Sequence, residues 1–328
     1  MLYHTPDNRW PIFGCKDYDS YLERYLVKGF FHKKVPEPIL KEFETIEFLM
    51  AHAWYHYPMY DEAMNKLLRT LELAVKLKCK ELNIAVEFID KKGRKQNHTL
   101  AQLITFIHQR GEYKKLKIFL DHLKDLRNAL MHPNQISFLG GMHYNKIILT
   151  INIINILFAN EQQVLALDER REILRVEMTR FNNKTLSFQR GQERILAHNM
   201  SFGDVFIDHS SEILLLDIDP VAKFEEGTEL RNKWVTPLFV EIKNPNIQAT
   251  FISGTDLISG LEIHICLHEH PQDTSIAQKF REQVFKITLP GSDLDFPEAQ
   301  YNPQLTFSFN EKALQMQKFR CRHYHKLK

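Results

Sequence analysis

Residues 112–134 have the sequence EYKKLKIFLDHLKDLRNALMHPN, and this stretch decides the fold expected for the first half of the chain. Its large apolar residues recur at intervals of three and four, as on one face of an α-helix. They are Leu116, Phe119, Leu120, Leu123, Leu126 and Leu130. Pro133 cannot continue a helix. The pattern predicts a helix from Tyr113 to His132 that buries this apolar stripe against other helices.

Further helices are expected on both sides of that one. Apolar residues keep a helical spacing in four more stretches. These run from Pro36 to the break at Tyr57-Pro58, from Met64 to Leu82, from Leu100 to Arg110 and from Tyr144 to Asn160. Thr99 and Gln102 form the pattern of a capping box for the third of these. The last is apolar on nearly every side, which indicates burial in the core or against a partner chain.

The pattern changes after about residue 182, where short runs typical of β-strands alternate with turn signals. The runs are 185–188, 205–207, 213–218, 238–242, 261–267, 285–289 and 305–309. The expected fold class is α+β, with an all-α bundle followed by a separate β-rich domain. We divide the chain into an N-terminal arm (1–35), the helical bundle (36–162), a charged linker or helix (163–181) and a β-rich regulatory or recognition domain (182–328).

Length and composition narrow the class of protein. A chain of 328 residues with 44% hydrophobic residues suggests about two folded domains. Its 43 basic and 41 acidic residues leave a net charge of +2, so any RNA-binding surface must be local. Four widely spaced cysteines are typical of reduced thiols. No signal peptide is visible, and the most apolar run, 147–158, is shorter than the ~20 residues of a membrane helix. We expect a cytoplasmic protein with no membrane partner.

Three polar residues near the end of the helix at 113–132 point to chemistry on a phosphodiester. Arg127, Asn128 and His132 lie within reach of one another at a proline-terminated helix end. Arginine offers a planar fork of donors to phosphate oxygens. Histidine titrates near neutrality and can move a proton to or from a ribose hydroxyl. Asn128 can orient the imidazole or donate to the phosphate.

The run Arg127-Asn128-Ala129-Leu130-Met131-His132, in an array of five helices, resembles the Arg-x4-6-His signature of the HEPN superfamily. The resemblance covers about residues 36–162. It implies a homodimer in which two Arg/His sets form one composite cleft and cut RNA without a metal or another cofactor. Arg127 would hold the scissile phosphate, and His132 would act as general acid or base. The products would be 2′,3′-cyclic phosphate and 5′-hydroxyl ends.

The resemblance also implies a biological setting, a toxin or an antiviral defence effector, with a regulatory protein or a phage-derived trigger as a further partner. Some HEPN toxins carry a modifiable tyrosine two residues after the histidine. This chain has Asn134 there, so that mode of silencing is not carried over. The alternative is a non-catalytic HEPN module that binds RNA, nucleotide or a partner protein. A plainer alternative is that Arg127 and His132 only complement the dipole of a helix C-terminus.

Other patterns in the sequence have both a plain structural interpretation and a functional one. Asp121 and Asp125 are expected to pair with Lys117 and Lys124 on a solvated face, and the basic turn 91–95 is expected to be a solvated loop more often than a phosphate contact. Two metal sites are the less favoured interpretations of strand patterns. A zinc site would use Glu262, His264, Cys266, His268 and His270 with Cys321, His323 and His325. A magnesium nuclease site would use Glu241 and Lys243 with Asp204 or Asp208. The basic tail at 318–326 is expected to be a mobile terminus or a nucleic-acid contact.

Overall fold

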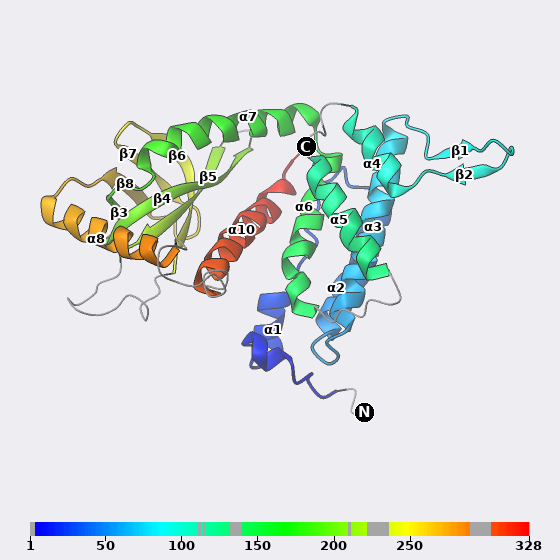
Figure 1. Cartoon of the computed structure of the whole chain (residues 1–328), viewed down its shortest axis with the longest axis horizontal. Coiled ribbons are helices and arrows are strands. Elements are labelled where there is room, and N and C mark those ends of the chain that lie inside the picture. The colour runs from blue at the N-terminus through cyan, green and yellow to red at the C-terminus, as the bar shows by residue number, and fades with distance from the viewer. Residues whose placement is uncertain are drawn as a thin grey trace. The chain divides into compact units, whose positions relative to one another are not determined.

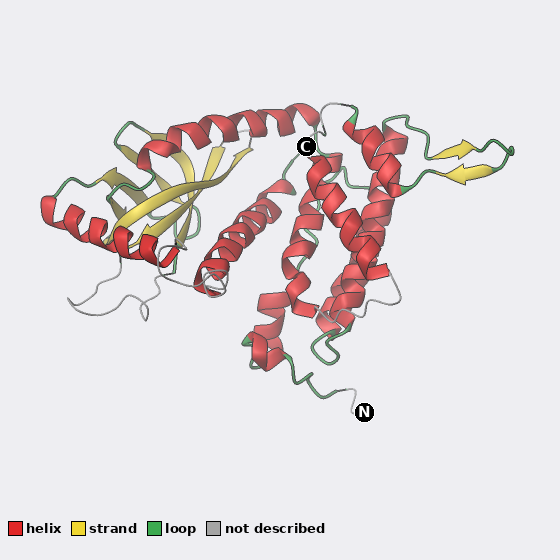
Figure 2. Cartoon of the chain, in the orientation of Figure 1, coloured by secondary structure: helices red, strands yellow, loops and turns green. Residues whose placement is uncertain are grey.

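The computed structural model describes residues 4–110, 113, 116–131, 140–208, 211–221, 236–288 and 303–327. The chain divides into two compact units, one formed by residues 1–165 with 320–328 and the other by residues 166–319. The first is helical apart from one small hairpin, and the second contains the large sheet (Figures 1 and 2). The α+β class, with helices before the sheet, is therefore confirmed.

The helical unit is organised around its longest helix. This helix, α3 (Met59–Glu81), packs against α2 (Glu37–His52), α4 (Leu100–His108), α5 (Leu116–Met131) and α6 (Tyr144–Phe158) (Figure 1). Four of them fall within the stretches that the apolar spacing predicted, and α3 begins five residues before the predicted Met64, directly after Pro58. The predicted capping box is present, since the Thr99 hydroxyl accepts from the Gln102 N–H at 3.3 Å and the Gln102 side chain accepts from the Thr99 N–H at 2.8 Å. Most of α6 is buried, as its all-round apolar character indicated.

The N-terminal segment packs on these helices. It contains a short 3₁₀ turn (Trp10–Phe13) and α1 (Tyr18–Tyr25). Trp10 is fully buried and donates its indole N–H to the Ala53 carbonyl at 2.7 Å. Asp7 accepts from Arg9 at 2.7 Å and from the Tyr57 N–H at 3.0 Å. These bonds connect the start of the chain to the end of α2.

A β-hairpin lies between α3 and α4. Its strands β1 (Glu87–Ile89) and β2 (Lys95–Asn97) are antiparallel, and the predicted basic turn forms the tip between them. Only the turn could be predicted from the sequence, because three-residue strands are too short to show a period. All residues of both strands are exposed.

In the second unit, six described strands form a closed antiparallel barrel. They are β3 (Leu186–Arg190), β4 (Glu193–Asp208), β5 (Ser211–Pro220), β6 (Leu238–Ile247), β7 (Phe251–Asp256) and β8 (Glu262–Leu267). The barrel closes where β3 pairs with β8, with Leu186 opposite Leu267. Alternate residues such as Leu214, Leu216 and Ile218 point into its apolar core. Closure leaves the sheet without the unpaired edges that favour aggregation.

Charged pairs join the outer face of the barrel to helices. In α7 (Glu161–Met178), Arg171 donates to Asp204 of β4 at 2.6 Å, and Asp204 is only 1% exposed. In α10 (Pro303–Tyr324), Lys312 lies 2.5 Å from Asp217 of β5. The segment at 163–181 is therefore mainly a helix, one of the two forms expected for it.

Two predicted strands are wrong. Residues 285–288 belong to α8 (Pro271–Thr288), and residues 305–309 belong to α10. Both runs have a local β-type composition, but the first is the end of the helical stretch 271–288 and the second lies near the start of the helical stretch 303–324. Once nucleated, a helix propagates one hydrogen bond per residue, so the longer pattern prevails over a short apolar run. Among the described residues, no helix is long and apolar enough to span a membrane.

Candidate functional site

The candidate site lies on α5, and the burial of that helix sets which way its polar residues face. Leu116, Leu120 and Leu123 are buried, as predicted. Phe119 is 37% exposed, so its assignment to the buried stripe is wrong. The helix contacts α3, α4 and α6 along a narrower face than the apolar pattern suggested, and Ile118 is 76% exposed. Unsatisfied apolar surface therefore remains on α5.

Arg127 faces α3 and is held by an ion pair. One Nη of its guanidinium lies 3.0 Å from a carboxylate oxygen of Glu72, and its side chain is 34% exposed. The other Nη donates to the side-chain oxygen of Asn128 at 3.3 Å. Its Nε–H is shielded from solvent and has no hydrogen-bond acceptor among the described residues. The guanidinium is thus oriented from two sides but remains reachable by solvent.

Glu72 is the site residue that sequence reasoning missed. It lies in α3 and also accepts from Lys76, one helical turn later, at 2.7 Å. The carboxylate therefore lies between a lysine and the candidate arginine. In the sequence, Glu72 is marked only by its i, i+4 spacing from Lys76. This spacing identifies an ion pair on one helix, but it does not show that Arg127 of another helix faces the same carboxylate.

Of the other two predicted site residues, the structure describes only Asn128. Asn128 is exposed beside Arg127. His132 lies outside the described residues, so its position relative to Arg127 is not part of this geometry. The described chain resumes at Gly140, whose N–H donates to a carboxylate oxygen of Asp61 at 2.8 Å, and His143 lies 3.1 Å from the same oxygen. A buried carboxylate of α3 thus holds the chain where it enters α6.

The acidic residues of α5 behave as predicted. Asp121 accepts from Lys117 and lies 3.5 Å from Lys124, which in turn lies 3.2 Å from Asp125. The hydrogen bond from Lys117 is the main reason why the pKa of Asp121 is lowered. These carboxylates are paired with lysines of the same helix on its surface, so we assign them no role in the site.

The zinc pattern is not assembled in the described residues, where no three histidine, cysteine, aspartate or glutamate side chains gather as a metal set. Glu262 and His264 lie on the outward, exposed face of β8, as the preferred interpretation expected. Cys321 and His323 lie in the last turn of α10 and are buried. They are therefore helical, and the expectation of a mobile tail is wrong for them.

The magnesium pattern is also separated by the fold. Asp204 and Glu241 both pair with Leu215, from opposite sides, so the whole of β5 lies between them. Two strand spacings are about 10 Å between backbones, and the described residues contain no group of three metal-ligand side chains at this place. Asp204 is occupied by Arg171, whereas Lys243 is exposed. The side chain of Asp208 lies outside the described residues.

The guanidinium of Arg127 is paired with one carboxylate and is one-third exposed, an arrangement that would allow it to bind an anion. An arginine fixed by one carboxylate keeps donors available for a phosphate, and it stays charged at any physiological pH. Comparison with protein-family models, with curated proteins and with solved structures finds no match for this chain. The function must therefore be argued from the site itself.

Proposed function

We propose that the protein is a metal-independent endoribonuclease of the HEPN type, acting through a composite Arg127/His132 site at a homodimer interface. The observation that supports this most is the arrangement of Arg127, which stands at the end of an amphipathic helix, oriented by Glu72 and still one-third exposed. An arginine whose only purpose was to complement the helix dipole would need no partner on a neighbouring helix.

The reaction follows from the chemistry of the two side chains. Arg127 would bind the non-bridging oxygens of the scissile phosphate and stabilise the charge that grows on them in the transition state. One imidazole would take the proton from the ribose 2′-hydroxyl as its oxygen attacks phosphorus. A second would give a proton to the departing 5′-oxygen. Bond formation to O2′ and cleavage to O5′ leave a 2′,3′-cyclic phosphate and a 5′-hydroxyl.

A second copy of the chain would supply the second imidazole. Support for this comes from α5, which leaves Ile118 and Phe119 exposed beside its buried stripe. Such apolar surface favours a protein contact, and a two-fold contact uses the same patch twice. In this proposal the barrel unit restrains the bundle or recognises a trigger, as in a toxin or antiviral effector.

The direct test is cleavage of a labelled RNA by the purified full-length chain in EDTA. Wild type should produce cyclic-phosphate ends, and Arg127→Ala and His132→Ala should each lower the rate at least 100-fold. Arg175→Ala is the matched control, because Arg175 is an exposed arginine of α7 paired only along its own helix. An all-deoxy strand of the same sequence should not be cut.

Three results would overturn the proposal in different ways. Cleavage that EDTA abolishes but that survives His132→Ala would indicate a metal nuclease elsewhere in the chain. Binding of RNA without cleavage, with and without a candidate trigger, would favour the non-catalytic HEPN module. A strictly monomeric protein that cleaves at full rate would refute the composite site.

A further inference from the structure

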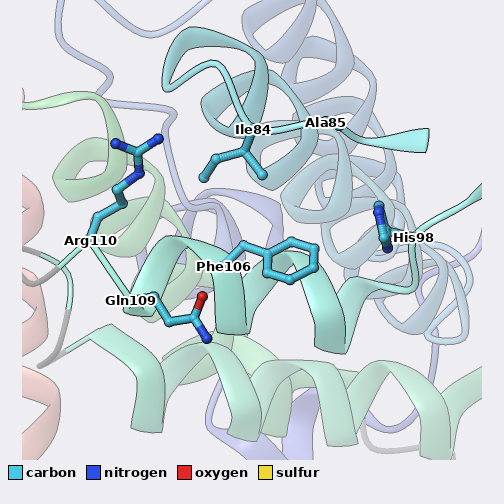
Figure 3. Close-up of a pocket in the computed structure, with 6 residues that line it drawn as sticks. All are labelled: Ile84, Ala85, His98, Phe106, Gln109 and Arg110. Carbon is cyan, nitrogen blue, oxygen red and sulfur yellow. The ribbon is translucent and has the colours of Figure 1, made fainter. Parts of the chain in front are cut away.

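A pocket at the base of the β1–β2 hairpin has the lining expected of a nucleotide subsite. It has a volume of about 430 Å³ and is lined by Ile84, Ala85, His98, Phe106, Gln109 and Arg110. In Figure 3, Ile84 lies above the Phe106 ring, His98 lies at one end, and Gln109 and Arg110 lie at the other. The lining therefore combines apolar and aromatic walls with a few polar groups at the rim, as in small-ligand sites.

An aromatic row leads from this pocket to the hairpin. The rings of His98 and Phe106 meet edge to face with their centroids 5.1 Å apart. On the other side of His98, the ring of Phe88 lies 4.7 Å away, and Phe88 is 40% exposed. Exposed and half-buried rings of this kind are stacking surfaces for nucleobases, because every base has a π-face. An aromatic row that only filled the core would be covered.

The charges around the pocket are suited to phosphate. The acids of the hairpin are paired within it, since Asp90 binds Arg94 at 2.9 Å and Glu87 lies 2.5 Å from Lys95. Lys91 and Lys92, at the tip, have no carboxylate partner among the described residues. Arg110 likewise has none there, and its guanidinium donates to the Leu82 carbonyl at 2.9 Å. The local excess of charge is therefore positive, although the whole chain is nearly neutral.

We infer that this pocket binds a base of single-stranded RNA, with Phe106 and His98 against the base, Gln109 on its polar edge and Arg110 on the neighbouring phosphate. Lys91 and Lys92, at the tip of the hairpin, would contact phosphates farther along the strand. An apolar ligand would leave the rim cations without a partner, and a phosphate alone would not use the rings. The inference deepens the proposed function, on which it rests for the identity of the polymer. It assigns to the bundle a substrate-binding site separate from the residues that would cut.

The test measures binding apart from cleavage. A fluorescent 12-nucleotide strand with 2′-O-methyl groups keeps its bases and phosphates but lacks the attacking hydroxyl, so the full-length protein can be titrated without turnover. Phe106→Leu should weaken binding about tenfold. Gln109→Ala removes an exposed side chain and should weaken it several-fold; this variant keeps the test valid should Phe106→Leu fail to fold. Phe48→Leu, at an exposed phenylalanine of α2, is the control.

The phosphate contacts are tested by salt dependence. Replacing Lys91 and Lys92 together by Gln should lower the slope of log affinity against log salt by about 1.4, the value for two lost single-strand contacts. The matched control replaces the adjacent exposed pair Lys33 and Lys34 by Gln, which should leave the slope unchanged.

The outcomes separate this inference from the proposed function. Strong binding that depends on Phe106 and on the hairpin lysines, in a protein that cuts no RNA, would support the pocket and refute the nuclease. RNA cleavage, together with RNA binding that none of these substitutions weakens, would support the nuclease and refute the pocket. Absence of RNA binding at 100 µM protein (roughly the weak limit of non-specific binding) would overturn the pocket.

Discussion

Replacing Glu72 by Gln tests whether this carboxylate holds Arg127 in place. The substitution preserves the shape of the side chain and removes its charge, so Lys76 and Arg127 lose their common partner. Two unit charges ~4 Å apart attract by about 4 kcal/mol at an effective dielectric constant of ~20. Arg127 is 34% exposed, and solvent screening together with side-chain entropy reduces the net contribution to about 1 kcal/mol.

The assay is urea unfolding of the full-length chain, followed by tryptophan fluorescence in a Trp234→Phe background. Trp10 and Trp54 then report on the helical unit alone, since both are buried in it. This choice matters because a two-unit chain need not unfold in a single step. Glu72→Gln should lower the free energy of unfolding of this unit by about 1 kcal/mol.

A double-mutant cycle identifies the partner. Arg127→Met combined with Glu72→Gln should show a coupling energy of about 1 kcal/mol between the two positions. Glu37→Gln is the control, because its pair with Lys41 is about 70% exposed on both sides and should contribute under 0.5 kcal/mol. A coupling energy indistinguishable from zero would refute the claim that Glu72 orients the guanidinium.

Three other substitutions test the supports of the two units. Thr99→Ala removes the capping hydroxyl of α4 and should lower the free energy of unfolding by about 1 kcal/mol. Thr105→Ala, at an exposed position inside the same helix, should change it little, and equal effects of the two substitutions would argue against the cap. Asp204→Asn removes the buried carboxylate that accepts from Arg171, which keeps its 2.6 Å contact with Asp168, and should destabilise the barrel by about 2 kcal/mol, measured by thermal unfolding. Glu172→Gln, on the surface of α7, should have no such effect, and a difference under 1 kcal/mol between the two variants would contradict the burial argument. The guanidinium of Arg9 lowers the pKa of the Asp7 carboxyl from 3.8 to about 2. The ionised carboxylate therefore stabilises the fold above about pH 4, and this stabilisation is lost as the pH falls toward 2. The Arg9 side chain is more than a third exposed, so solvent screening reduces the effect, and wild type should lose about 1 kcal/mol over this range beyond what Asp7→Asn loses. Parallel pH profiles would show that the pair contributes nothing.

The helical unit could be predicted because its information is local. Apolar spacing, the capping box at Thr99 and the proline breaks each depend on residues a few positions apart, and the five helices formed where these signals lie. The same local reasoning failed at 285–288 and 305–309, where a short β-type run is embedded in a longer helical stretch. Closure of the barrel could not be predicted from local patterns either, because the pairing of β3 with β8 joins residues about 80 positions apart.

The sequence by itself determined that Arg127 and Asn128 stand at the end of an amphipathic helix, because 3.6 residues per turn set the direction of each side chain from its number alone. Only the tertiary structure decided what Arg127 meets. The packing of α5 on α3 brings Glu72 to it across 55 positions of sequence, and the return of α4 after the hairpin brings Phe106 beside His98. Such long-range contacts depend on how the helices pack. Helix packing is set by many side chains together, and no short run of residues encodes it.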